Sequence, residues 1–153
     1  MSNLINFAFK KAKNEKRPAL LTYTVAGDSS NKQSLEILKS ISNYADILEL
    51  GVPHNALVAD GNQIQTSAYR AIKNGIKLKD IFLMVRNFKK SKKHKPIILM
   101  GYYNMVYQFG ENNFLNMCKK VNVDGLILVD LPWPENKKFA RKCKKKSIYF
   151  IQL

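Results

Sequence analysis

The sequence predicts an α/β fold in which helices alternate with the strands of one parallel sheet. Short runs rich in β-branched residues and leucine recur along the chain, as strands do. The segments between these runs place apolar residues at helical spacing. The third and fourth runs, PIILMGY and VDGLILVD, are apolar on both faces, as parallel strands are when they are covered. Such alternation favours a parallel sheet with crossover helices.

The strands are predicted at residues 19–25, 46–52, 96–102, 123–130 and 147–153. Two architectures fit this pattern, a doubly wound open sheet and a (β/α)₈ barrel. No G-x-G-x-x-G sequence follows the first strand, and a G-x-x-x-x-G-K-[ST] phosphate loop is absent. Five strands are too few to close a barrel, which typically takes about 250 residues. We therefore expect a single domain, 1–153, that is either an open five-stranded sheet or the front part of a longer barrel.

The predicted helices each carry an apolar stripe that would face the sheet. Their stripe residues are Leu4, Phe7, Ala8 and Ala12; Ile37, Leu38, Ile41, Tyr44 and Ala45; Ile64, Ala68, Ala71 and Ile72; Ile81, Val85 and Phe88; the segment ENNFLNMCKK; and Phe139, Ala140 and Cys143. The turn AGDSSN supplies a helix cap, Asp80 is expected to cap the fourth helix, and Gly75 fits the end of the third. Pro134 is expected just inside the start of the last helix.

The net charge of +15 suggests a nucleic-acid partner, but the residues do not support one. Only four of the 26 basic residues are arginine, which is typical of an AT-rich coding sequence. The lysine clusters at 87–95 and 137–146 are interpreted as solvated helix surfaces. Zinc-finger spacing and aromatic-basic RNA motifs are absent, so no specific nucleic acid is expected.

Composition also bears on compartment and cofactors. No run approaches the about 18 apolar residues of a membrane helix, and the N-terminus lacks a signal-peptide pattern, which predicts a cytoplasmic protein with no membrane partner. Cys118 and Cys143 show no metal spacing and are interpreted as free thiols. With two histidines in the chain, no metal site is expected.

A carboxylate interrupts the second strand, ILELG, at Glu49. Side chains alternate along a strand, so Leu48 and Leu50 share one face while Ile47 and Glu49 share the other. If the leucines face the covering helices, Glu49 lies on the opposite face near the carboxyl end of the strand. Burial there would raise its pKa and suit it to proton transfer near neutral pH. The alternative is a register slipped by one residue, with Glu49 paired to a surface lysine.

Further polar residues follow the same ends of other strands. Asp130 ends the fourth strand, Tyr102 follows the third, and Asp60 lies in the loop after the second. Asp124 starts the fourth strand at the opposite end, where a structural role is expected. Because the carboxyl ends of parallel strands meet at one edge of the sheet, these groups are expected to form one constellation.

The ordered segments LELGVP, ADG and Ile64–Gln65 resemble the tryptophan synthase alpha chain family. In that family a strand ending Leu-Glu-Leu-Gly-(Ile/Val)-Pro is followed by a loop ending Ala-Asp-Gly and by Ile-Gln in the next helix. AGD after the first strand, MGYYN at 100–104 and VDGLILVDLP at 123–132 are also similar to family segments. The resemblance runs from about residue 18 to the end.

This resemblance implies a TIM barrel, here with only about its first five strands, and a lyase of L-tryptophan biosynthesis. The implied reaction is the retro-aldol cleavage of indole-3-glycerol phosphate to indole and glyceraldehyde 3-phosphate. Glu49 would be the general acid and base, and Asp60 would hold the indole N–H. Tyr102 would line the indole pocket, as would Leu99 or Leu126 if they face inward, and Asp130 is expected to contact the substrate.

The resemblance also implies partners. This chain would use no cofactor of its own, and a β chain carrying pyridoxal phosphate would receive the indole in an α₂β₂-type assembly. Between Pro53 and Ala59, however, His54 to Val58 replace the usual Phe-Ser-Asp-Pro-Leu, with Ala56 at the acidic position. Asn62 also replaces a common proline. Coupling to a β chain is therefore in question.

The family carries its glycine-rich phosphate site and mobile lid on later strands and loops. We therefore expect a fragment with little or no activity from these residues alone. Three alternatives remain: another barrel enzyme with a lysine at a strand end, a non-catalytic basic interaction or nucleic-acid-binding module, and a non-functional remnant. No lysine ends a predicted strand, which disfavours the first.

Overall fold

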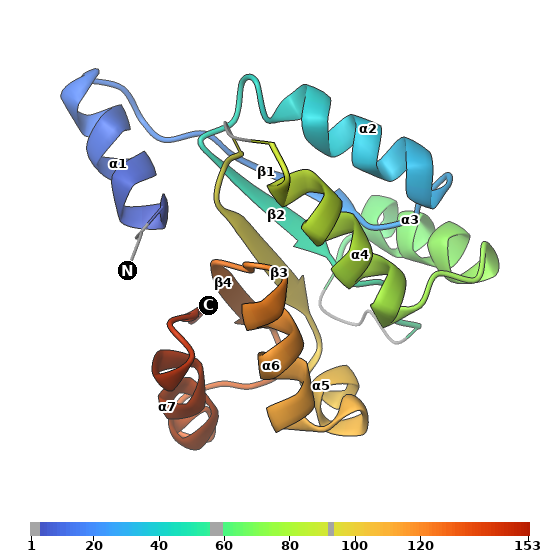
Figure 1. The fold of residues 1–153 in the computed structure, drawn as a ribbon. Coiled ribbons are helices and arrows are strands. Elements are labelled where there is room, and N and C mark those ends of the chain that lie inside the picture. The colour runs from blue at the N-terminus through green and yellow to red at the C-terminus, as the bar shows by residue number, and fades with distance from the viewer. Residues whose placement is uncertain (1–3, 56–59, 92–93) are drawn as a thin grey trace.

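A computed structural model describes residues 4–55, 60–91 and 94–153 and contains one parallel five-stranded sheet (Figure 1). The strands are β1 (Leu21–Val25), β2 (Ile47–Gly51), β3 (Ile97–Gly101), β4 (Gly125–Leu128) and β5 (Tyr149–Ile151). The helices are α1 (Leu4–Asn14), α2 (Asn31–Ile41), α3 (Asn62–Lys73), α4 (Leu78–Lys89), α5 (Tyr103–Phe109), α6 (Glu111–Lys120) and α7 (Lys137–Lys145). The predicted strands are thus confirmed.

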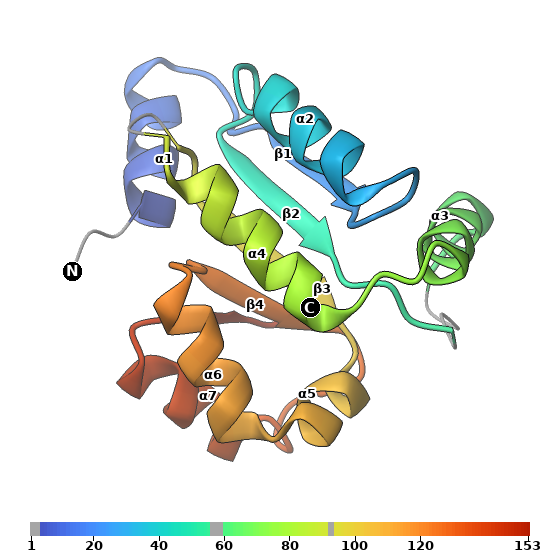
Figure 2. The same ribbon diagram turned by 45° about the vertical axis from the view of Figure 1, so that its right-hand side comes forward.

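The strands follow one another across the sheet in the order β1-β2-β3-β4-β5. A doubly wound sheet reverses its strand order at a switch point, and this sheet does not. Figures 1 and 2 show α2, α4 and α6 on the same side of the sheet. The consecutive order with crossovers on one side is that of a (β/α)₈ barrel, of which five strands are present.

The main core lies between the sheet and these crossover helices. Leu48 and Leu50 of β2 are fully buried there, and the slipped register is therefore wrong. The helix side of this core is contributed by Leu38, Phe82, Val85, Phe114, Leu115, Phe139 and Cys143. Burying a large aliphatic or aromatic side chain stabilises a fold by about 1.5–3 kcal/mol, so this layer is the main source of stability.

The opposite face of the sheet carries a smaller apolar cluster at its amino-terminal end. Ile47, Ile98 and Ile127 pack there against Ile5 and Ala8 of α1. Helix α1 therefore covers the amino-terminal part of the sheet face on which Glu49 lies. Its buried stripe contains Ile5 in place of the expected Phe7, whose exposed fraction is 66%.

Two helix boundaries differ from expectation. Helix α2 ends at Ile41, and Tyr44, expected on its inner stripe, is 79% exposed because the chain has already left the helix. Helix α4 begins before Asp80, whose Oδ2 accepts the Lys77 N–H at 2.9 Å from the third helical position. Ser30 caps α2 as expected, by accepting the Gln33 N–H.

Two other local features were not predicted. Helix α5 follows β3 almost immediately, and its short sequence YNMVYQF lacks the repeated apolar spacing that identifies longer helices. Pro134 lies before α7, which starts after Asn136, and the Trp133–Pro134 peptide bond is cis. The expected position of Pro134 inside the helix is therefore wrong. Over the described ranges, no helix has the length and apolar character required to cross a membrane.

Candidate active site

Glu49 lies on the face opposite the main core, two residues before the end of β2. It pairs in register with Tyr23 of β1 and Ile98 of β3 and is only partly exposed. Burial raises the pKa of its carboxyl group. Within the described ranges it takes part in no ion pair. A partly desolvated carboxylate of this kind can both give and take a proton.

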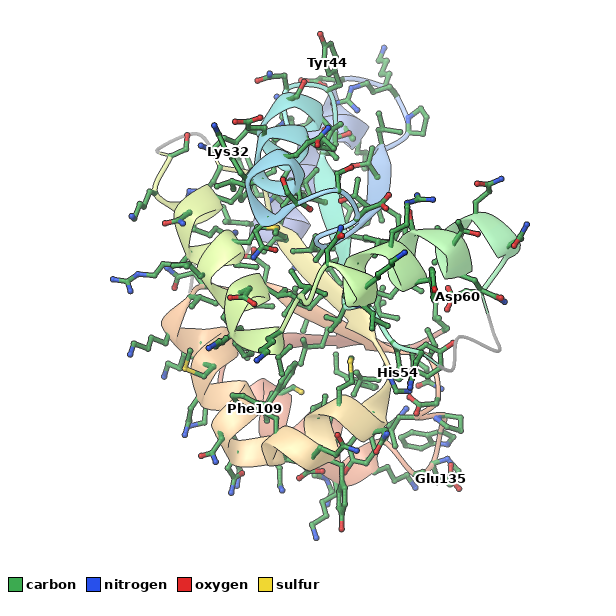
Figure 3. All side chains as sticks on the ribbon, turned by 90° about the vertical axis from the view of Figure 1, so that its right-hand side faces the viewer. Lys32, Tyr44, His54, Asp60, Phe109 and Glu135 are labelled. Carbon is green, nitrogen blue, oxygen red and sulfur yellow. The ribbon has the colours of Figure 1, made fainter. Side chains whose placement is uncertain are left out.

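Asp60 is joined to Tyr102 across 42 residues of sequence. The Tyr102 hydroxyl donates a hydrogen bond to Asp60 Oδ2 at 3.0 Å, and Tyr102 itself is buried. The His54 ring lies beside the Tyr102 ring, with centroids 5.1 Å apart. Figure 3 shows Asp60 and His54 at the same end of the sheet. The structure thus brings Asp60 and Tyr102 together, as expected for polar groups at the carboxyl ends of neighbouring strands.

Tyr23 belongs to the same group and was missed by the sequence analysis. Its hydroxyl lies against the backbone of Gly51, where an added Cβ would be 2.1 Å away. Burial, together with the charges of Asp60 and Glu49, raises the pKa of Tyr23 to about 12. The phenol therefore stays protonated as a donor close to both carboxylates. Strand alternation in LTYTV was the available signal, because Tyr23 shares the face of Glu49 through their register.

Leu99 and Leu126 were expected to line the indole pocket if they face inward. Both face away from Glu49. Both lie in register with Leu50 and are buried in the core under the helices. Their expected place in the indole pocket is therefore corrected. The apolar residues on the Glu49 face of these strands are Ile98 and Met100 of β3 and Ile127 of β4.

Asp130 follows β4 at the same end of the sheet. Its Oδ1 accepts the Tyr103 N–H at 2.6 Å, which ties the β4–α7 connection to the start of α5. The residue is exposed. Substrate contact by Asp130 stays a prediction. Asp124, at the other end of β4, accepts Lys89 Nζ at 2.5 Å and the Ile97 N–H at 2.8 Å, which agrees with its expected structural role.

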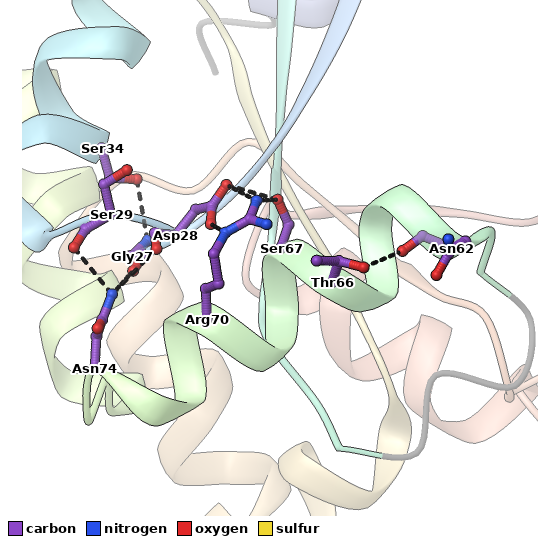
Figure 4. Close-up of polar contacts among 9 residues, drawn as sticks. All are labelled: Gly27, Asp28, Ser29, Ser34, Asn62, Thr66, Ser67, Arg70 and Asn74. Atoms are coloured by element: carbon purple, nitrogen blue, oxygen red, sulfur yellow. Dashed lines mark hydrogen bonds and ion pairs between the residues drawn. The ribbon is translucent and has the colours of Figure 1, made fainter.

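Asp60 lies directly before the N-cap residue of helix α3. Gly61 is the N-cap residue, and Gln65 Nε2 donates to the Asp60 carbonyl oxygen at 2.7 Å. Further along, Ser67 and Arg70 of α3 hold Asp28 in the loop after β1, as Figure 4 shows.

The loop positions Ala56 and Val58 lie outside the described residues, together with 57 and 59. No group of three or more His, Cys, Asp or Glu side chains that could hold a metal occurs among the described residues.

The fold and these groups together define a class of protein. The consecutive parallel sheet with its crossovers on one side is part of a (β/α)₈ barrel. Glu49 lies near the carboxyl end of its strand, the end at which such barrels place their active sites. The structural match to the tryptophan synthase subunit alpha from Legionella pneumophila has a TM-score of 0.92 at 34% identity. It covers 98% of this chain and 58% of that one.

Sequence comparison gives the particular family. The family model of the tryptophan synthase alpha chain matches residues 9–153, and the chain therefore belongs to this family. It is 75% identical over 151 residues to a tryptophan synthase alpha chain from Pelagibacter ubique, covering 99% of this chain and 57% of that relative. It is 41% identical over 135 residues to one from Pyrococcus furiosus, covering 88% of this chain and 54% of that relative. The chain thus spans a little over half the length of the curated relatives it matches.

Proposed function

We propose that residues 1–153 supply the proton-transfer groups of a lyase that cleaves indole-3-glycerol phosphate to indole and glyceraldehyde 3-phosphate. The observation that carries this proposal is the pairing of two differently placed carboxylates at one end of the sheet. Glu49 is partly desolvated and takes part in no ion pair within the described ranges, whereas Asp60 is held by the Tyr102 hydroxyl. Family membership supports the same reaction.

The retro-aldol reaction needs two proton movements. A proton is delivered to the indole ring carbon that carries the side chain, and the neighbouring side-chain hydroxyl loses its proton as the carbon–carbon bond breaks. Glu49 would perform this transfer, because burial raises the pKa of its carboxyl group and so favours the protonated form that can deliver a proton, while the carboxylate left behind can accept one.

Asp60 would accept a hydrogen bond from the indole N–H. Positive charge develops on that nitrogen when the ring carbon is protonated, and an anion fixed beside it stabilises the charge. The bond from Tyr102 fixes the orientation of Asp60 Oδ2, and the Tyr102 ring would form a wall of the indole pocket. Asp130 is proposed as a further substrate contact.

The partner and the cofactor belong to the same proposal. A similar solved structure from Pyrococcus furiosus is a tryptophan synthase complex, with a TM-score of 0.83 at 40% identity, over 86% of this chain and 54% of that one. A second describes mutual activation of an α₂β₂ complex. We propose a β chain as partner, with pyridoxal phosphate on that chain and none on this one, in the cytoplasm.

A chimera provides the decisive test. Residues 1–153 replace the matching part of the Pelagibacter ubique relative, and indole release from indole-3-glycerol phosphate is measured. Glu49→Gln should slow release by roughly a hundredfold to ten-thousandfold, as loss of a positioned acid–base group does. Asp60→Asn should slow it by roughly a hundredfold to a thousandfold, as loss of one electrostatic stabiliser of the transition state does. Glu36→Gln, at an exposed carboxylate on α2, is the matched control and should keep the starting rate. Equal rates in all variants would refute the proposed roles.

A further inference from the structure

The loop after β1 is fastened to α3 by a compact set of polar contacts (Figure 4). Arg70 Nε donates to Asp28 Oδ1 at 2.6 Å, and Arg70 Nη2 donates to Asp28 Oδ2 at 2.9 Å. Ser67 donates to the same Oδ2 at 2.6 Å. Asn74 Nδ2 donates to the carbonyl oxygens of Asp28 and Ser29 at 3.1 and 2.9 Å. We name this set of residues, Asp28, Ser29, Ser67, Arg70 and Asn74, the α3 clamp.

Helix α3 also packs against β1 through a small apolar cluster. Ala68 and Ala71 are its buried residues, and together with the partly buried Ile64 they pack against Val25 of β1. This cluster is much smaller than the main core under α2, α4 and α6. The α3 clamp adds directional polar contacts to this small apolar cluster, and such contacts fix the rotation of the helix and its position along the sheet.

The placement of α3 in turn decides the placement of Asp60. Asp60 directly precedes the N-cap residue, and Gln65, one turn into the helix, donates to its carbonyl oxygen at 2.7 Å. On its other side the Asp60 carboxylate accepts from Tyr102, which directly follows β3 and is the N-cap residue of α5. Asp60 thus lies between α3 and the residue that follows β3, and a shift of α3 would pull it away from Tyr102.

The chemistry of the Asp28–Arg70 pair suits positioning better than stabilisation. The Arg70 side chain is 51% exposed, and exposed ion pairs add little to the free energy of unfolding. The two parallel N–H···O bonds nevertheless fix a plane and an angle, which a single contact does not. In keeping with this geometry, the Arg70 hydrogen bonds hold the pKa of Asp28 below its usual range.

We propose that Asp28 and Arg70 are positioning residues for the reaction, which act by holding α3 so that Asp60 meets Tyr102 and the substrate. This inference rests on the proposed function for its kinetic consequence, but its structural consequence can be measured without turnover. Misplacement of a reacting group by about 1 Å can cost on the order of a hundredfold in rate.

A second bidentate pair provides a matched control. Arg17 donates to both oxygens of Asp46, at 2.6 and 2.8 Å, and the Leu20 N–H donates to Asp46 Oδ2 at 2.8 Å. This pair has the same chemistry but lies before β1 and β2, at the amino-terminal end of the sheet. It contacts neither α3 nor Asp60.

The experiment compares Arg70→Met, Arg70→Lys and Asp28→Asn with Arg17→Met. In the 153-residue chain, amide hydrogen exchange is followed in residues 60–70, and crystal structures report the distance between the Tyr102 hydroxyl and Asp60 Oδ2. In the chimera, kcat and KM for indole release are measured. Arg70→Met should increase exchange locally, lengthen the 3.0 Å contact and lower kcat about tenfold or more, with less than a threefold change in KM.

Further outcomes separate positioning from general stability. Arg70→Lys should recover part of the lost kcat, and the double variant Arg70→Met with Asp28→Asn should be no worse than Arg70→Met alone, because the pair acts as one unit. Arg17→Met should lower the midpoint of unfolding without altering exchange in residues 60–70. An unchanged Tyr102–Asp60 contact in Arg70→Met, or an equal loss of kcat in Arg17→Met, would overturn the inference. If the chimera releases no indole, the proposed function fails, while exchange and the contact distance still decide the positioning role.

Discussion

The two ends of the sheet use carboxylates in opposite ways. At the amino-terminal end, Asp46 and Asp124 are nearly buried and each accepts a cationic side chain and a backbone N–H. At the carboxyl end, Glu49 takes part in no ion pair within the described ranges, and the Asp60 carboxylate accepts from the neutral phenol of Tyr102. Satisfied charges stabilise a fold, whereas an unsatisfied carboxylate is available for chemistry. The comparison separates a structural end of the molecule from a reactive one.

At the structural end, the largest expected loss of stability comes from removing the buried ammonium group of Lys89. Lys89→Met leaves Asp124 without its cation, and the side chains of these residues are 3% and 15% exposed. Breaking such a buried pair by removing one partner costs about 3–5 kcal/mol. Urea unfolding should report this loss, while Lys90→Met, at the exposed neighbouring lysine, should change the free energy of unfolding little. A loss below about 1 kcal/mol would mean that the Lys89 stem packs well without its charge.

At the reactive end, Gly51→Ala should be the most damaging small change. Its Cβ would lie 2.1 Å from the Tyr23 hydroxyl and 2.6 Å from the adjoining ring carbon, so the Tyr23 ring must move. Overpacking of this kind typically costs about 1–3 kcal/mol. Thermal unfolding of Gly51→Ala alone and combined with Tyr23→Ala tests the cause. The second change should relieve much of the clash, and an additive loss would assign the damage to the backbone.

The structural end should lose stability in acid. Arg17 holds the pKa of Asp46 well below its usual range. The stability contributed by Asp46 is therefore present above the unfolded pKa of about 4 and is lost as the pH falls through the folded value. Asp46→Asn should be less stable than the parent at pH 6, with the difference shrinking towards pH 2. Denaturant unfolding across this range measures it, and a constant difference would point to lost packing.

Glu49 should show a smaller effect of opposite sign. Its folded pKa is raised by burial, so the folded state holds its proton more tightly than the unfolded state does. Stability therefore falls as the pH rises above the unfolded pKa of about 4.3. Glu49→Gln should be slightly more stable than the parent at pH 7 and equal to it near pH 3. A Glu49→Gln chain that is less stable at pH 7 would show that the carboxylate has a stabilising partner.

Local periodicity was sufficient for the fold class and for the face of Glu49. The period of two in a strand fixes which side chains share a face, and the burial of Leu48 and Leu50 then places Glu49 opposite. The same periodicity could not orient Leu99, because the face of one strand relative to another depends on the register between them. That register pairs Leu99 with Leu50, in the core under the helices.

Local sequence patterns also failed to predict one short helix and the end of another. Helix α5 has seven residues, too few for an apolar stripe to repeat, and the expected end of α2 at Ala45 extended past the last helical residue, Ile41. A turn that continues an apolar spacing is indistinguishable from a helix by spacing alone.

The sequence by itself determined the α/β class, the strand positions and, through family motifs, the identity of Glu49 and Asp60 as candidate groups. The sequence also predicted that Asp60 and Tyr102 lie at one end of the sheet, and the tertiary structure supplied their hydrogen bond. Only the tertiary structure joined Tyr23 to Gly51 and Asp28 to Arg70. The physical reason is that strand periodicity and capping depend on neighbours within a few residues. Contacts over tens of residues are instead set by the register of parallel strands and by the packing of the helices that connect them.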